Sequence, residues 1–181
     1  GIDIIDAGLS TTPSIEMAVI NLRAAGGIIL TASHNPREWN ALKLLNEKGE
    51  FISAEEGHQI IELSNLDGLV YANIDSIGQK TFYNTSIEDH INSILTIPYL
   101  PIALIKSKKY HVVADCINST GSLAIPALLD SLGCTYELIN SHPDGNFRHN
   151  PEPLEEHLSE LINATKNKAD IGIAVDPDVD R

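Results

Sequence analysis

The chain has 181 residues, of which 43% are hydrophobic and 20% are charged, a composition typical of a globular protein with one or two apolar cores. Its net charge of −13 argues against nucleic acid as a partner, because nucleic-acid phosphates are bound by clustered Lys and Arg. No apolar run approaches the ~18 to 20 residues that a membrane span needs, so no membrane partner is expected either.

Expected strands and helices alternate in the first half of the chain. Thr12 is expected to cap a helix that opens at Pro13 and stops at Gly26, and Ser53 with Glu56 forms a capping-box pattern before a later helix. Residues 66–85 are weakly patterned. The expected strands are 1–6, 27–31 and two within 41–53, around a turn at 47–49, and the expected helices are 13–25, 53–64 and 87–95.

A change of composition at residues 97–108, with two prolines and a basic cluster, indicates a domain boundary. The chain is therefore expected to divide into residues 1–100 and 101–181. Beyond the boundary the expected strands are 110–116, 134–139 and 170–175, and the expected helices are 122–133, closed by Gly133, and 153–165, opened by Pro153. Strands joined by helix-length connections predict an α/β fold with mixed, largely parallel sheets.

Both ends of the chain look cut, because it begins inside an expected strand and stops on Arg181 directly after another. We therefore expect an excerpt of a longer protein. Cys116 and Cys134 lie in apolar settings, which favours buried thiols in a reducing, cytoplasmic compartment over a disulfide.

The segment "DPDVDR" places Asp176, Asp178 and Asp180 on alternate positions after the last expected strand. In a flat strand they would lie about 6.6 Å apart per pair, whereas oxygens on one Mg²⁺ lie within ~4.2 Å of each other. The segment must therefore curl to bind an ion, and Pro177 favours a loop there. The alternatives are a solvated acidic loop and, more weakly, a calcium loop, which Arg181 disfavours by replacing its glycine.

The stretch "TASHNP" (31–36) directly follows an expected strand, so Ser33 lies where α/β sheets place ligands. Each of three nearby side chains also has an ordinary explanation: Ser33 as a turn residue, His34 as a surface histidine, and Lys43 as a strand lysine whose amine reaches water. A desolvated Lys43 would lose its proton more easily, which suits proton transfer. Together with three carboxylates, these side chains favour phosphoryl transfer.

Four segments carry a resemblance to a known family. Residues 12–50, with the T-A/G-S-H-N-P loop, resemble the first domain of the α-D-phosphohexomutases. Residues 111–134, 143–153 and 170–181 resemble the second domain, which ends in a D-G-D-x-D-R metal loop. The residue pattern "PDGNFRHNPEP" resembles the phosphomannomutase/phosphoglucomutase or the phosphoglucosamine mutase branch of the family. Pro177 departs from the usual glycine, and Ala41-Leu42 replaces the usual glycine-hydrophobic pair.

The resemblance implies two α/β phosphohexomutase-type domains, the first lacking its N-terminal part and the second truncated after the metal loop. It also implies that phosphate moves between the 1 and 6 positions of a hexose phosphate through phosphorylated Ser33 and a bisphosphorylated sugar. Mg²⁺ would be held by Ser33, Asp176, Asp178 and Asp180, with a hexose 1,6-bisphosphate as activator. Lys43 would act as general base and acid, His34 would assist, and Arg181 would bind phosphate.

Two other functions remain open from the residues. One is a non-catalytic phosphosugar-binding relative of the same fold, and the other is a metal-dependent phosphatase, which leaves "TASHNP" unexplained. The hexose, whether glucose, mannose or glucosamine phosphate, depends on a third domain that we expect to be absent, as is a fourth, so the excerpt alone is expected to be inactive. The sequence assigns no oligomeric state.

Overall fold

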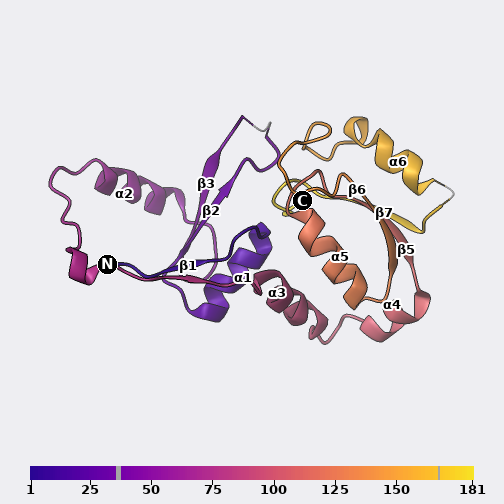
Figure 1. Cartoon of the computed structure of the whole chain (residues 1–181), viewed down its shortest axis with the longest axis horizontal. Coiled ribbons are helices and arrows are strands. Elements are labelled where there is room, and N and C mark those ends of the chain that lie inside the picture. The colour runs from indigo at the N-terminus through magenta and orange to yellow at the C-terminus, as the bar shows by residue number, and fades with distance from the viewer. Residues whose placement is uncertain (36–37, 167) are drawn as a thin grey trace.

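The structure is a computed structural model that describes residues 1–35, 38–166 and 168–181. Figure 1 shows an elongated molecule, with the first half of the chain at one end and the second half at the other. The first half contains β1 (Ile4–Asp6), α1 (Thr12–Leu22), β2 (Gly27–Thr31), β3 (Ala41–Leu45), α2 (Ala54–Ser64), η1 (Ile74–Ser76), β4 (Lys80–Phe82) and α3 (Ser86–Leu95). The second half contains α4 (Ile102–Lys108), β5 (His111–Asp115), α5 (Gly121–Ser131), β6 (Thr135–Ile139), η2 (Glu155–His157), α6 (Ser159–Thr165) and β7 (Ile171–Ala174).

The second half is built on a parallel sheet with the strand order β6-β5-β7. From β5 the chain steps to its neighbour β6, and from β6 it returns past β5 to β7, in the opposite direction. Right-handed crossovers therefore place α5 and α6 on opposite faces of the sheet, as Figure 1 shows. A buried cluster between β5 and α5 forms the core: Val112, Ala114, Cys116, Ile125, Leu129 and Val175. The carboxyl ends of all three strands meet at one edge, and the acidic loop that follows β7 begins there.

The first half holds two small sheets, a parallel pair of β1 with β4 and an antiparallel pair of β2 with β3. Val19 of α1 packs on Ile29 and Leu45 of the β2–β3 pair. The antiparallel register places Lys43 opposite Ile29. Helix α3 contacts both α1 and α5, so it connects the two halves. The mixed but largely parallel α/β fold predicted from the sequence is confirmed.

The ends of α1 differ from the prediction. Thr11, not Thr12, is the N-cap, because the Thr11 side chain accepts the hydrogen bond from the backbone N–H of Ser14. The helix ends at Leu22 rather than running to Gly26, since Arg23 takes a left-handed conformation (φ 52°) and its N–H bonds to the carbonyl of Ile20. Gly27 already belongs to β2.

Two other segments also differ from the prediction. Within 41–53, β3 is followed by a single bridge between Leu45 and Phe51 instead of a second strand. The helix expected from Pro153 is divided into η2 and α6, because Leu158 leaves helical dihedrals (φ −102°, ψ 19°) and a new helix begins at Ser159. The weakly patterned residues 66–85 contain η1 and β4.

Several predicted helix signals are confirmed. The capping box of Ser53 and Glu56 is present in both directions, at 2.7 and 3.2 Å. Gly133 follows α5 with φ +67°, and its N–H bonds to the carbonyl of Asp130. The sequence predicts a domain boundary at 97–108, and helix α4 lies in this segment. Pro98 and Pro101 precede the helix, and Lys106 and Lys108 lie in its last turn.

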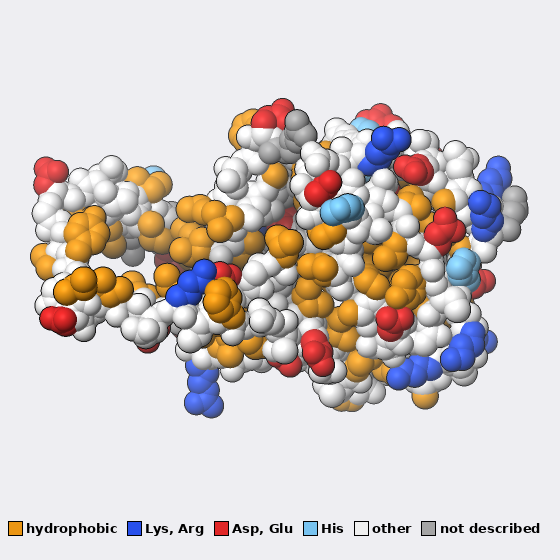
Figure 2. Space-filling model, in the orientation of Figure 1, with side chains coloured by type: hydrophobic (Ala, Val, Ile, Leu, Met, Phe, Trp, Pro, Cys, Tyr) orange, Lys and Arg blue, Asp and Glu red, His pale blue; other side chains and the backbone are white. Residues whose placement is uncertain are grey.

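Apolar side chains are exposed over much of the first half, as the orange areas of Figure 2 show. They include Ile28 and Leu30 of β2 and Val70 and Tyr71 beyond α2. Across the described ranges, no helix has the length and apolar character required to cross a membrane.

Candidate active site and metal centre

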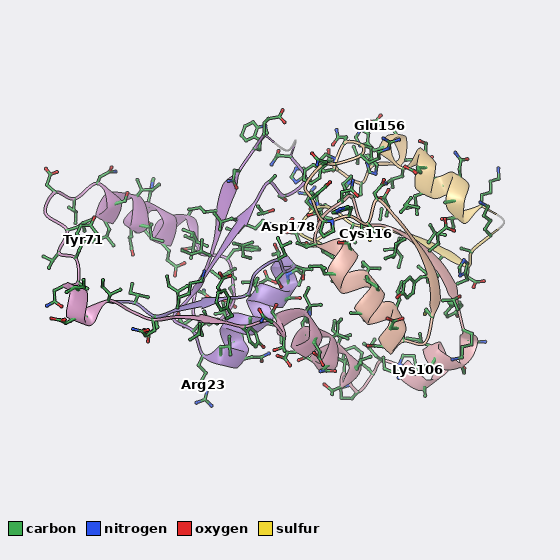
Figure 3. All side chains as sticks on the ribbon, in the orientation of Figure 1. Arg23, Tyr71, Lys106, Cys116, Glu156 and Asp178 are labelled. Carbon is green, nitrogen blue, oxygen red and sulfur yellow. The ribbon has the colours of Figure 1, made fainter. Side chains whose placement is uncertain are left out.

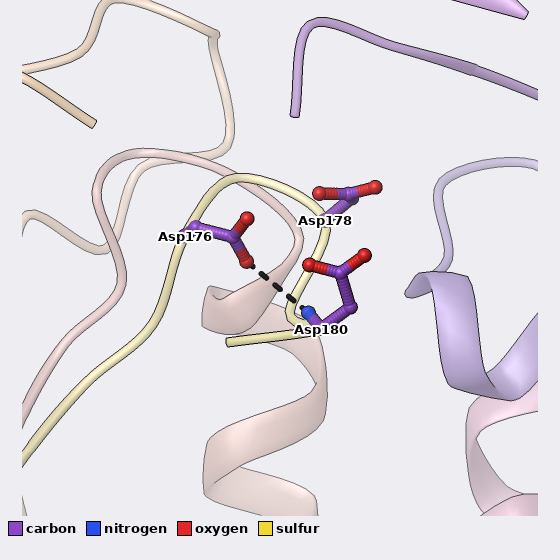
Figure 4. A group of neighbouring side chains, drawn as sticks. All are labelled: Asp176, Asp178 and Asp180. Carbon is purple, nitrogen blue, oxygen red and sulfur yellow. Dashed lines mark hydrogen bonds between the residues drawn. The ribbon is translucent and has the colours of Figure 1, made fainter. Parts of the chain in front are cut away.

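The acidic loop after β7, residues 176–180, curls as a metal site requires. Asp176, Asp178 and Asp180 each offer a carboxylate oxygen, and these oxygens lie within 4.8 Å of one another (Figure 4). The curl comes from Val179, which has a left-handed φ of 60°, and from the N–H of Asp180, which donates to Asp176 Oδ1 at 3.1 Å. The extended geometry that would separate the carboxylates is therefore avoided.

Charge in this loop is concentrated and partly removed from water. Asp176 is fully buried and Asp178 is 4% exposed. Burial, followed by repulsion from Asp178 and Asp180, raises the pKa of Asp176 to about 6. In the described part of the chain, Asp176 Oδ2 and Asp178 Oδ1 are buried oxygens that lack a hydrogen-bond partner. Such carboxylate oxygens suit a hard divalent cation, so the residues present fit Mg²⁺.

The turn that opens α5 supports the acidic loop from the side. The hydroxyls of Ser119 and Thr120 both donate to the carbonyl oxygen of Pro177, at 2.6 and 2.8 Å. These two residues follow Ile117 and Asn118, which both have a positive φ and turn the chain sharply after β5. Figure 3 shows Asp178 at the junction of the two halves, close to this end of α5.

Lys43 on β3 brings the first half of the chain to the same carboxylates. Its Nζ lies 2.6 Å from Asp178 Oδ2 and 2.6 Å from Asp180 Oδ2, with the lysine side chain 19% exposed. Burial lowers the pKa of Lys43, but its hydrogen bonds to the two carboxylates and their charge outweigh burial and raise the pKa above its ordinary value. The expectation of a lysine that loses its proton readily is wrong for this arrangement, in which Lys43 is an ammonium ion.

The loop that carries Ser33 begins directly after β2. Ser33 is half-buried and has a left-handed φ of 51°, and its N–H donates to Thr31 Oγ1 at 2.8 Å. His34 Nδ1 lies 3.3 Å from Ser33 Oγ. The side chain of Asn35 donates to the carbonyl of Ala32 at 3.2 Å and closes the turn. Pro36, the last residue of the motif, lies outside the described residues.

The predicted site residues thus fall into three groups. Lys43, Asp178 and Asp180 are in contact, with Asp176 beside them. Ser33 and His34 contact each other in the loop that follows β2. Arg181 lies apart, with Nη1 3.8 Å from Glu152 Oε1 and its side chain 45% exposed.

Sequence reasoning missed four residues around the acidic loop: Thr12, Glu16, Ser119 and Thr120. The Thr12 hydroxyl donates to Asp178 Oδ2 at 2.6 Å. Burial, and then the charge of Asp180, raises the pKa of Glu16. The spacing of Thr12 and Glu16, four residues apart on α1, is a signal that they share a helix face. Nothing in the local sequence indicates which carboxylates that face meets.

Comparison with known proteins agrees with the α/β fold. Residues 1–67 match the family model described as phosphoglucomutase/phosphomannomutase, alpha/beta/alpha domain I, and residues 88–181 match that of domain II. The chain belongs to the phosphoglucomutase/phosphomannomutase family.

Curated relatives carry mutase names. The chain is 38% identical over its whole length to a phosphoglucomutase/phosphomannomutase of Thermococcus kodakarensis, of which it covers 40%. It is 32% identical over its whole length to a phosphoglucosamine/phosphogalactosamine mutase of Sulfurisphaera tokodaii, again covering 40%. The chain therefore spans about two fifths of the length of these relatives.

Solved structures share the fold. A putative phosphomannomutase from Thermus thermophilus superimposes over the whole chain with a TM-score of 0.84 at 24% identity, and the match covers 41% of that protein. A phosphoglucomutase/phosphomannomutase family protein from Burkholderia thailandensis gives a TM-score of 0.76 at 23% identity over 98% of this chain and 39% of that one.

Proposed function

We propose that this chain is part of a phosphohexomutase that moves phosphate between the 1 and 6 positions of a hexose phosphate. The observation that carries the proposal is the acidic loop, with buried carboxylate oxygens that lack partners among the described residues, joined by Lys43 to the half of the chain that bears Ser33. The mutase names of the relatives support the same activity.

Ser33 would carry the phosphate. In the forward half-reaction the bond from Ser33 Oγ to phosphorus breaks and a bond from a sugar hydroxyl oxygen to phosphorus forms. The hydroxyl proton passes to a base, and the released Ser33 Oγ takes up a proton. The bisphosphorylated sugar then turns over, and its other phosphate returns to Ser33 Oγ. His34, 3.3 Å from that oxygen, would orient it and assist proton movement.

Asp176, Asp178 and Asp180 would hold Mg²⁺, with a phosphate oxygen on Ser33 as a further ligand. When bound, the ion would neutralise charge on the transferring phosphoryl group. Lys43 would exchange the proton of the sugar hydroxyl: its ammonium is the acid form, and it would act as the base once it had separated from its two carboxylates and given up its proton. Arg181 would place a guanidinium on phosphate after leaving Glu152.

The finer features of the activity follow the family resemblance. We propose a hexose 1,6-bisphosphate activator, a cytoplasmic location and a domain division near residue 100. A fungal relative in fold, the N-acetylphosphoglucosamine mutase of Aspergillus fumigatus, was solved in complex with GlcNAc-6P and magnesium, which supports a hexose phosphate and Mg²⁺ here. The choice among glucose, mannose and glucosamine phosphates is a question for the full-length protein.

The test is phosphorylation of Ser33. Incubating the full-length protein with glucose 1,6-bisphosphate and Mg²⁺ should add one phosphoryl group, found by intact-mass measurement and placed on Ser33 by peptide mapping. Ser33→Ala should lose both the phosphoryl group and mutase activity, with stability nearly unchanged because the half-buried hydroxyl contacts only its own loop among the described residues. A non-catalytic phosphosugar-binding protein would bind the sugar without becoming phosphorylated, and that result would refute the proposal.

A further inference from the structure

We propose that Thr12 is a positioning residue for the metal centre, whose hydroxyl determines which oxygen of Asp178 faces the cation. The inference rests on the proposed metal site of the acidic loop. Thr12 belongs to the first turn of α1, in the opposite half of the chain from Asp178, and the two residues are separated by 166 positions.

Two hydrogen bonds join Thr12 to Asp178. The backbone N–H of Thr12 donates to the carbonyl oxygen of Asp178 at 2.8 Å, and Thr12 Oγ1 donates to Asp178 Oδ2 at 2.6 Å. The hydroxyl must be the donor in the second bond, since an ionised carboxylate can only accept. Thr12 is 1% exposed and Asp178 is 4% exposed, so water does not compete readily for either group.

These contacts give the two carboxylate oxygens of Asp178 different hydrogen bonding. Oδ2 accepts from Thr12 and from Lys43 Nζ, both at 2.6 Å. Oδ1 is buried and has no partner among the described residues, as is also true of Asp176 Oδ2. A carboxylate whose one oxygen is held by donors cannot rotate freely, so the other oxygen is presented to the ion. Outer hydrogen bonds of this kind orient metal ligands and raise metal affinity.

The side chains of Thr11 and Thr12 make different hydrogen bonds at the same end of α1. Thr11 caps α1, since its Oγ1 accepts from the backbone N–H of Ser14, and it is 2% exposed. Thr12 instead directs its hydroxyl across to the acidic loop. The partial positive charge at the start of the 11-residue helix favours the carboxylates there as well. The two neighbouring threonines therefore allow helix stability to be separated from metal positioning.

The experiment compares Thr12→Val, Thr12→Ser and Thr11→Val in the full-length protein. Affinity for Mg²⁺ is measured by titration calorimetry and affinity for Mn²⁺ by electron paramagnetic resonance, without substrate, and thermal melts report folding. Thr12→Val should weaken both metals by about 10- to 100-fold, the usual effect of losing an outer hydrogen bond to a ligand. Thr12→Ser keeps the hydroxyl and should stay within about threefold of the wild type. Thr11→Val should melt at a lower temperature with unchanged metal affinity.

Each other outcome overturns the inference. Wild-type affinity in Thr12→Val would show that Asp178 is oriented without the hydroxyl. Equal weakening in Thr11→Val and Thr12→Val would show that only helix stability matters. If Thr12→Val does not fold, Thr12→Ala is judged by the same criterion, and a weak-binding Thr12→Ser also counts against the role. A wild-type protein that binds neither metal would refute the metal site itself, which distinguishes that failure from failure of the Thr12 role alone.

Discussion

Lys43 occupies the position of a counter-ion for the acidic loop, so we expect it to compete with a divalent cation for the same carboxylates. Lys43→Met keeps an unbranched side chain, one atom shorter than lysine, and removes its charge. The ammonium makes two contacts of 2.6 Å, to Asp178, whose side chain is 5% exposed, and to Asp180, whose side chain is 27% exposed. Exposed ion pairs contribute up to about 1 kcal/mol, and breaking buried pairs costs about 3 to 5 kcal/mol. This intermediate site should give a loss of about 2 kcal/mol in the free energy of unfolding.

Added Mg²⁺ should reduce that loss. A cation at about 100 times its dissociation constant stabilises a protein by about 2.7 kcal/mol. In the wild type the ion must displace or share with Lys43, whereas in Lys43→Met it meets uncompensated carboxylates and should bind more tightly. The difference in unfolding free energy between the two proteins should therefore fall below about 1 kcal/mol at saturating Mg²⁺. Denaturant titrations of the full-length proteins, with Mg²⁺ or with a chelator, measure it.

Lys80→Met is the matched control. Lys80 pairs with a single aspartate, Asp6 at 2.7 Å. Its Nζ lies 5.0 Å from the centre of the Phe82 ring, much as the Nζ of Lys43 lies 5.7 Å from the centre of the Phe51 ring. Its side chain is 54% exposed and it belongs to β4, so the loss should be small and independent of Mg²⁺. A gap between wild type and Lys43→Met that is the same with and without Mg²⁺ would show that Lys43 and the cation do not share ligands.

Three further predictions concern other parts of the chain. Burial lowers the pKa of His90 below its ordinary 6.5, so His90 contributes stability above pH 6.5 that is lost as the pH falls. His90→Gln should therefore flatten the pH dependence of the melting temperature between about pH 7 and 5, and an unchanged slope would contradict this. Burial, then the charge of Asp115, raises the pKa of the Cys116 thiol from 9.0 to about 12. At about pH 8 its thiolate fraction is then about a thousandfold lower than that of a thiol with a pKa of 9.0, so iodoacetamide should label Cys134 first, as measured by peptide mass spectrometry. Asp115, 1% exposed, accepts from His149 Nε2 at 2.9 Å, and Asp115→Ala should cost about 3 kcal/mol in denaturant titrations, a value below about 1 kcal/mol indicating that the pair is not structural.

The part of the site that can be predicted from sequence is the part encoded locally. Asp176, Asp178 and Asp180 alternate within five residues, a pattern that predicts a cation site if the loop curls and leaves a solvated acidic loop as the alternative. The capping box at Ser53 and the glycine after α5 are likewise signals within a few residues, and the structure contains both. A proline at position 177 in place of the usual glycine did not prevent the curl, because Val179 takes the positive φ.

Contacts between distant segments could not be predicted in this way. The Asp178 carboxylate bonds to Lys43 across 135 positions and to Thr12 across 166, and no local pattern encodes either pairing. The raised pKa of Lys43 has the same origin: its burial was expected from the apolar stretch around it, but its carboxylate partners were not. Strand β4 was missed because its three residues are exposed and pair with β1, far earlier in the chain.

The site is therefore divided between the two halves of the chain, and each half lacks what the other supplies. The second half gathers carboxylates at a buried position: burial first, and then repulsion from Asp178 and Asp180, raises the pKa of Asp176. The first half supplies the donors, the ammonium of Lys43 and the hydroxyl and N–H of Thr12, while α3 packs on both α1 and α5. Packing of the two halves and compensation of the carboxylate charge therefore favour each other. If the two halves separated, Asp178 would lose its hydrogen-bond donors, and if the donors were removed, the carboxylates at the junction would repel one another without compensation. Since Ser33 lies between the two strands of the β2–β3 pair that carries Lys43, the contact that compensates part of the carboxylate charge also ties the proposed phosphoserine loop to the proposed metal centre.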